Sequence, residues 1–244
     1  DGEVAFAPLP YAEPGKVREA LSTDVHTHEE AERALSDFLL RQMGHAARKI
    51  AIAHEFVAGG SASDSERPLS IGGTDLISAD VFAPYNYTAL GHLHGPQKAG
   101  GKENVRYSGS LLKYSFSEAT QKKGVIVGEI NGAGQVKTEF ISLSPRHDVR
   151  IIKGFFDDLI KEKSEDFLMA ELLDEGPVID AMARLRQKYP RMMTIQSHRR
   201  MNSGSGERSF DLMKKVDPLD MFRVFYKEFQ DKEFTEEEEN YMKE

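Results

Sequence analysis

Short apolar runs that end in glycine or a polar residue recur along this chain, a pattern typical of buried and half-buried β-strands. They predict strands over residues 4–9, 49–54, 88–91, 105–108, 124–130, 136–141, 149–155, 167–172 and 192–196. The connection 131–134 indicates a β-hairpin, because its glycines readily adopt positive φ. Helical patterns alternate with several of these runs, so we expect a mixed α/β (α+β) protein.

An amphipathic helix is predicted between the first two strands. Thr27 and Glu30 have the spacing of a capping box, and the helix is expected to continue to Met43. One face of this helix carries the apolar residues Ala31, Leu35, Phe38 and Leu39. We expect His26 and His28, at the helix start, to be exposed to solvent.

Three later segments also have helical patterns. Residues 157–163 predict a short helix, and residues 178–189 predict a longer one with Pro177 in its first turn. The apolar stripe of the longer helix consists of Ile179, Met182, Ala183 and Leu185. A flexible linker at 202–206 precedes a helix that opens at Asp217. Its stripe of Leu219, Phe222, Phe225, Tyr226 and Phe229 indicates either partner binding or packing on its own domain.

Three histidines follow predicted strands. His54 ends the run 49–54, and His92 and His94 follow the run 88–91 in a Gly-His-x-His sequence. Side chains at i and i+2 of a strand share a face, so His92 and His94 are expected to project together. If His54 ends a neighbouring strand, the three imidazoles converge as transition-metal ligands. The alternative is that each is a polar cap or a hydrogen-bonded core side chain.

Composition narrows the class of protein. The chain has no cysteine, which excludes disulfides and thiolate metal sites, and no apolar run approaches the length of a membrane span. We therefore expect a cytoplasmic protein. The net charge is −8, but acidic residues are concentrated at 236–239. Basic clusters that could face phosphate are Lys122-Lys123, Arg146 with Arg150 and Lys153, and Arg199-Arg200.

Several ordered blocks of the sequence resemble a known family. Residues 54–60, 89–97, 106–118, 145–150 and 177–186 are similar to the SbcD family. Its members are nuclease subunits of bacterial SbcCD DNA-repair complexes and belong to the calcineurin-like metallophosphoesterase superfamily. The resemblance implies metal-dependent phosphodiester hydrolysis at DNA ends and hairpins.

The resemblance also implies a fold and a domain order. Residues 1–145 would form the C-terminal half of a four-layer metallophosphoesterase β-sandwich flanked by helices. A small α/β capping domain that orients DNA would follow at 146–200, and a linker with helices at 201–244. The superfamily carries Asp-x-His, Gly-Asp-x-x-Asp and Gly-Asn-His-Asp or -Glu motifs upstream. Because no Gly-Asp-x-x-Asp and no Gly-Asn-His sequence occurs here, we expect this chain to be the C-terminal part of a longer protein.

Site residues and a cofactor follow from the same resemblance. His54 and His92 would bind one manganese ion and His94 a second. The bridging aspartate and the histidine that protonates the leaving group would lie outside this chain. Two metals need carboxylates as well as neutral imidazoles, so we expect this chain to be inactive alone.

The expected partners are DNA and the coiled-coil base of an SbcC-type ATPase, which would bind the helices after the cap. A homodimer within a heterotetrameric complex is expected, with no membrane. Two other functions stay open: a non-catalytic scaffold that holds DNA and ATPase, and a metallophosphoesterase acting on a small phosphoester. Gly-His-x-His is shared across the superfamily, so the motif does not separate these functions.

Overall fold

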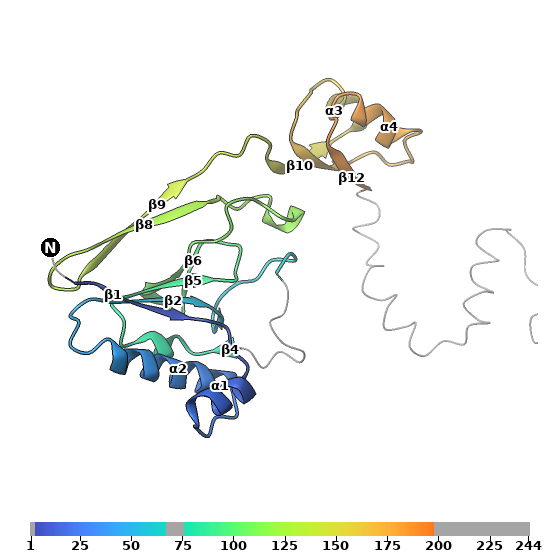
Figure 1. Ribbon diagram of the computed structural model, residues 1–244. Coiled ribbons are helices and arrows are strands. Elements are labelled where there is room, and N and C mark those ends of the chain that lie inside the picture. The colour runs from blue at the N-terminus through green and yellow to red at the C-terminus, as the bar shows by residue number, and fades with distance from the viewer. Residues whose placement is uncertain (1–2, 67–75, 198–244) are drawn as a thin grey trace, which may run out of the picture.

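The computed structural model describes residues 3–66 and 76–197, and it is a mixed α/β structure as expected (Figure 1). Its largest sheet has five strands in the order β1-β2-β5-β7-β6. These strands are β1 (Ala5–Leu9), β2 (Lys49–His54), β5 (Tyr87–Gly91), β7 (Lys102–Tyr107) and β6 (Gln97–Ala99). All neighbours pair in parallel except β6 with β7. The carboxyl ends of β1, β2, β5 and β7 therefore meet along one edge of the sheet.

A helix covers one face of this sheet, and a second, shorter helix packs against the first (Figure 1). Helix α2 (His28–Gln42) begins at the predicted capping box, in which the Thr27 side chain accepts from Glu30 N–H and the Glu30 carboxylate accepts from Thr27 N–H. Helix α1 (Pro14–Leu21) was not predicted, because its eight residues bury only Val17. The core between the helices and the sheet includes Ala7, Leu9, Ala51, Ala53, Val81, Phe82, Leu90, Val105 and Tyr107, with Leu35 and Leu39 of α2 packed against it.

The capping box makes the start of α2 a test of local stability. We expect Thr27→Ala to lower the free energy of unfolding by about 1 kcal/mol, because one helix N–H loses its acceptor. Urea unfolding followed by circular dichroism measures this difference. Thr120→Ala, at an exposed position outside any helix, is the control. Equal stability of the two variants would contradict the contribution assigned to the cap.

A β-hairpin lies over the other face of the sheet (Figure 1). Strands β8 (Gly124–Ile130) and β9 (Val136–Ser142) pair along their whole length, and the turn 131–134 connects them as predicted. The turn is tied to the sheet because Asn86 Nδ2 donates to Gly134 O at 3.0 Å. Gly134 has a φ of 78°, and a Cβ there would lie 2.5 Å from Asn86 Nδ2, so this position requires glycine.

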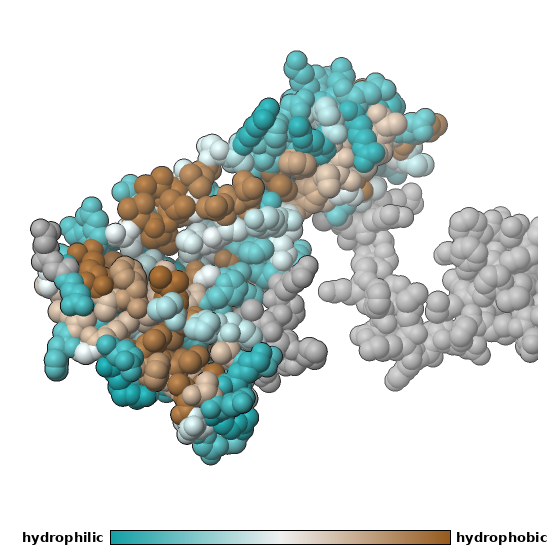
Figure 2. All heavy atoms as spheres, in the orientation of Figure 1, coloured by the Kyte–Doolittle hydropathy of each residue, from teal (hydrophilic) through white to brown (hydrophobic). Residues whose placement is uncertain are grey.

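Apolar side chains remain exposed on the β1–β2 part of the sheet face that the helices do not cover. Phe6 is 57% exposed and Ile52 is 49% exposed. They alternate with Ala7, Ala51 and Ala53, which are buried on the helix side. The space-filling view shows brown, hydrophobic surface over the sheet and the hairpin (Figure 2).

The shorter elements of the first part lie around the β2 and β5 ends. Strands β3 (Phe56–Val57) and β4 (Leu76–Ile77) pair in parallel, and the 3₁₀ helix η1 (Ala79–Phe82) follows β4. A second 3₁₀ helix, η2 (Phe116–Glu118), lies between β7 and β8. Sequence patterns did not predict these pieces, because two to four residues are too few to show a period.

A separate hydrophobic core forms further along the chain. Strands β10 (Val149–Gly154), β11 (Phe167–Leu172) and β12 (Met192–Ser197) form a parallel sheet, with helices α3 (Phe156–Leu159) and α4 (Ala181–Arg186) in the connections. This is the predicted strand–helix–strand–helix–strand order. The core consists of Phe156, Leu168, Ala170, Leu172, Leu185, Tyr189 and Met192.

The predicted helix over 178–189 was too long, and its apolar stripe was partly wrong. Asp180 adopts a left-handed conformation with φ of 52°, so α4 begins only after it. Ile179 consequently lies outside the helix and is 82% exposed, and Ala183 is exposed as well. At the other end, Lys188 N–H donates to Leu185 O, three residues back, as the α-helical pattern ends. The predicted helix 157–163 likewise shortens to the single turn of α3.

Lys113 connects the part of the chain that contains the five-stranded sheet to the part that contains the β10–β12 sheet. Its Nζ donates to Ala119 O at 2.7 Å, to Asp148 Oδ2 at 3.0 Å and to Val149 O at 3.3 Å. The predicted linker at 202–206 and the aromatic helix from Asp217 lie outside the described residues. Within the described residues, no helix is both long enough and apolar enough to cross a membrane.

Candidate metal centre

His54 and His92 lie together at the carboxyl ends of neighbouring parallel strands. His54 is the last residue of β2 and pairs in register with Gly91, the last residue of β5. The His54 and His92 ring centroids are 5.5 Å apart with an interplanar angle of 71°. A Cβ at position 91 would lie 2.8 Å from His54 Nδ1. Glycine is therefore needed at the end of β5 so that the His54 ring can approach its backbone.

The backbone of His92 is strained. Its φ is 108°, in a region that side-chain-bearing residues rarely adopt. Such conformations cost about 1–3 kcal/mol and are concentrated at functional sites. The strain also changes the geometry that the sequence predicted. Because β5 ends at Gly91 and the chain turns at His92, the i, i+2 rule for strands does not apply to His92 and His94.

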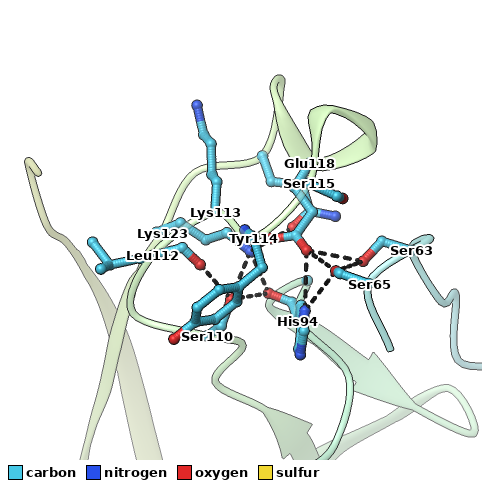
Figure 3. Close-up of polar contacts among 12 residues, drawn as sticks. Ser63, Ser65, His94, Ser110, Leu112, Lys113, Tyr114, Ser115, Glu118 and Lys123 are labelled. Carbon is cyan, nitrogen blue, oxygen red and sulfur yellow. Dashed lines mark hydrogen bonds and ion pairs between the residues drawn. The ribbon is translucent and has the colours of Figure 1, made fainter. Parts of the chain in front are cut away.

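His94 instead enters a polar cluster of its own (Figure 3). Its Nδ1 lies 3.0 Å from Glu118 Oε1 and 2.8 Å from Ser65 Oγ. Its backbone N–H donates to Glu66 Oε1 at 2.7 Å. The side chain is 23% exposed, so the ring is held by this cluster and still reaches solvent. Joint metal binding by all three histidines stays a prediction.

The centre of this cluster is a buried ion pair between Glu118 and Lys123. Their side chains are 0% and 4% exposed, and Lys123 Nζ lies 2.6 Å from Glu118 Oε2. Burial alone would raise the pKa of Glu118, but hydrogen bonds from Lys123, Ser65 and His94 outweigh it and hold the pKa at about 2. Glu118 is therefore a carboxylate at neutral pH.

Lys123 also supports the backbone around His94. Its Nζ donates to His94 O at 2.8 Å, to Ser110 Oγ at 2.9 Å and to Gln121 Oε1 at 2.8 Å. The interpretation of Lys122-Lys123 as a basic surface pair is thus wrong for Lys123, because its charge is buried and paired. Lys122 remains exposed. No local pattern distinguishes the two lysines; their burial depends on the loop between β7 and β8.

A second buried polar cluster lies at the start of α2. His28, predicted to be exposed, is only 6% exposed, and its Nε2 lies 2.6 Å from Oε2 of the fully buried Glu55. Tyr11 covers the His28 ring with a centroid separation of 4.7 Å. Glu32 is 1% exposed, and neither of its carboxyl oxygens has a hydrogen-bond partner within the described residues. Packing of α2 on the sheet buries His28 and Glu32. Their positions in the helix sequence did not predict this burial.

One further pair has the letters of a metal motif but not its surroundings. Asp24, Val25 and His26 read Asp-x-His, and they lie on the loop that precedes α2. His26 Nε2 is 3.0 Å from Asp24 Oδ1, with side chains 66% and 86% exposed. This contact lies on the surface, and the exposure predicted for His26 is confirmed.

The side chains at the strand ends suit nitrogen coordination. Within residues 3–66 and 76–197, no group of three or more His, Asp or Glu side chains is arranged to hold a metal ion. Imidazoles such as the close pair His54 and His92 are ligands that manganese, iron and zinc accept. The donor set therefore fits the nitrogen part of a transition-metal site. In the part of the chain that the structure describes, the oxygen ligands that a two-metal site needs are not grouped with it.

Comparison with protein families bears on the C-terminal part of the chain. Residues 145–229 match the family model SbcD_C, described as the type 5 capsule protein repressor C-terminal domain. The match includes β10, β11 and β12 and the helices between them, and it continues beyond residue 197. The C-terminal region of this chain, residues 145–229, is therefore SbcD-related.

Proposed function

We propose that this chain is part of an SbcD-type nuclease subunit that hydrolyses phosphodiester bonds at DNA ends and hairpins with an SbcC-type ATPase. The observation that carries the proposal is the SbcD_C match over residues 145–229. The paired histidines at the ends of β2 and β5 support it, because they lie in the part of the chain that precedes this match.

In this proposal His54 and His92 hold one manganese ion and His94 holds a second. Bound metals of this kind activate water and stabilise the attacking and leaving oxygens of a phosphoryl displacement. The protein's part is to present neutral imidazole nitrogens from rigid strand ends. The carboxylate ligands would come from a segment outside this chain, so we propose that the 244-residue chain is inactive alone.

The proposed partners are DNA and the coiled-coil base of the ATPase. The aromatic stripe of the helix predicted from Asp217, outside the described residues, would bind the coiled coil, within a heterotetramer that contains two copies of this subunit, in the cytoplasm. Two basic side chains of the predicted clusters form ion pairs with carboxylates. Arg150 bonds Asp166 at 2.8 Å and Lys153 bonds Glu171 at 3.0 Å, yet both side chains stay about half exposed. They can therefore still contact phosphate.

A manganese-dependent assay on a DNA hairpin tests the proposed activity. We expect cleavage by the full product of the gene and none by this chain. In the full product, His92→Asn should lower the rate by more than about 100-fold, because even indirect partners of a metal ligand contribute 10–100-fold. His45→Asn, at an exposed position just after α2, is the control. Cleavage by this chain alone would contradict the ligand assignment.

The second candidate function is a non-catalytic scaffold for DNA and the ATPase. The specific observation in its favour is that the described residues contain no three-membered metal-binding group. This function predicts hairpin binding without cleavage in both the chain and the full gene product. Cleavage of a small phosphodiester but not of DNA would instead indicate a small-substrate metallophosphoesterase.

A further inference from the structure

Glu118 is built into the fold as a charged hydrogen-bond acceptor. The 3₁₀ helix η2 places its carboxyl group where it is fully buried. Oε2 accepts from Lys123 Nζ at 2.6 Å and from Tyr114 N–H at 3.3 Å. Oε1 accepts from the Ser65 hydroxyl; Ser63 Oγ lies 3.3 Å from Oε1, but its hydrogen is directed to Glu66 Oε2 at 2.6 Å. An ionised carboxylate has no hydrogen to donate. Glu118 can therefore only accept a hydrogen bond from its remaining neighbour.

That remaining neighbour is the His94 ring. Nδ1 lies 3.0 Å from Glu118 Oε1, so Nδ1 must carry the hydrogen and donate it. Ser65 Oγ, 2.8 Å from the same nitrogen, donates its own hydrogen to Glu118 and leaves its lone pairs facing Nδ1–H. In a neutral imidazole with Nδ1–H, the lone pair is on Nε2. Figure 3 shows this second nitrogen pointing away from Glu118.

The backbone of His94 is held from both sides. The His94 N–H donates to Glu66 Oε1 at 2.7 Å. The His94 carbonyl oxygen accepts from Lys123 Nζ at 2.8 Å and from Ser110 N–H at 3.0 Å. The ring therefore has both its position and its tautomer set by surrounding side chains. A carboxylate behind a histidine is the arrangement that orients metal-binding imidazoles and raises their basicity.

We propose that Glu118, supported by Lys123 and Ser65, is a positioning residue that fixes His94 as the Nδ1–H tautomer and so presents Nε2 to a transition-metal ion. This inference rests on the proposed function, because it assumes that His94 is a metal ligand. It adds a residue that does not touch the metal itself. The buried ion pair is thereby assigned a role beyond the stability of the loop between β7 and β8.

The first test reads the tautomer directly. Two-bond ¹H–¹⁵N correlation spectra of the ¹⁵N-labelled chain at pH 8, assigned with His94→Asn, distinguish Nδ1–H from Nε2–H. We expect Nδ1–H in the wild-type chain and a shift towards Nε2–H in Glu118→Gln, whose amide can donate to Nδ1. Glu129→Gln, at an exposed position of β8, should leave the tautomer unchanged. An Nε2–H wild-type ring, or no change in Glu118→Gln, would overturn the proposal.

The second test uses Zn²⁺ alone as the probe. Titration should move the Nε2 resonance of His94, and calorimetry should show about 10–100-fold weaker binding for Glu118→Gln than for Glu129→Gln. If Glu118→Gln does not fold, Ser65→Ala is the milder variant, and it should weaken binding in the same direction. A Zn²⁺ shift at Nδ1, or at neither nitrogen, would overturn the ligand geometry.

These readouts separate the inference from the proposed function. Neither the tautomer nor Zn²⁺ binding requires nuclease activity. A wild-type Nδ1–H ring that binds Zn²⁺ through Nε2, together with a full gene product that does not cleave DNA, would uphold the positioning role and reject the nuclease. Cleavage of DNA by the full gene product, together with an Nε2–H ring of His94, would uphold the nuclease and reject the positioning role.

Discussion

Lys123→Met is expected to lower the free energy of unfolding by about 3–5 kcal/mol, the range for breaking a buried ion pair by removing one partner. The reason is that Glu118 would remain ionised and fully buried without its cation. The same substitution removes the hydrogen bonds from Lys123 to His94 O, Ser110 Oγ and Gln121 Oε1. Methionine fills a volume close to that of lysine, so the loss is electrostatic rather than one of packing.

Urea unfolding of the Lys123→Met and Lys122→Met chains measures this effect with a matched control. Lys122 is the neighbouring residue and is exposed, so its substitution should change stability by less than about 0.5 kcal/mol. The double variant Lys123→Met/Glu118→Leu should recover much of the loss, because replacing both partners removes the uncompensated charge. Similar stabilities for Lys122→Met and Lys123→Met would show that the ion pair is not buried as described.

The stability of the chain is expected to fall as pH rises between about 5 and 8, because of Glu32. Burial, with a smaller contribution from the charge of Glu55, raises the pKa of Glu32 from 4.5 to about 8. The folded state therefore binds one more proton than the unfolded state within this interval, and each pH unit removes up to about 1.4 kcal/mol. Over the interval from 4.5 to about 8, this group alone sets an upper bound of about 5 kcal/mol.

Glu32→Gln isolates this contribution, since glutamine resembles the protonated acid and does not titrate. The wild-type chain should lose stability relative to Glu32→Gln as pH rises from 5 to 9, whereas Asp37→Asn, at an exposed position of the same helix, should run parallel to wild type. The lowered pKa of Glu118 acts only below about 4.5, outside this range. A constant difference between wild type and Glu32→Gln would contradict the raised pKa.

Local sequence patterns were sufficient for most of the regular structure. The strand 49–54, the hairpin 124–130 with 136–142, and the capping box at Thr27 each depend on residues close together in the chain. Alternation of apolar and polar residues, turn glycines and cap side chains all act over a few residues. These features could therefore be predicted, to within a residue or two, without knowledge of the fold.

Where a single backbone angle determined the outcome, local patterns failed. The left-handed conformation of Asp180 excludes Ile179 from a helix that the apolar spacing had extended through it. The positive φ of His92 separates His92 from His94, although a Gly-His-x-His sequence after a strand predicts a shared face. Neither residue is glycine, so composition gave no signal of the unusual angle.

The sequence by itself determined the order of the longer strands and of helix α2, the absence of cysteine chemistry, and the placement of His54 and His92 at strand ends. Only the tertiary structure decided which polar groups are buried together. His28 meets Glu55 across 27 positions, His94 meets Glu118 across 24, and Ser65 meets Glu118 across 53. Such contacts depend on how parallel strands and long loops pack, which local periodicity does not encode. For this reason the sequence identified the candidate ligands, and the fold identified the carboxylate and lysine that hold one of them in place.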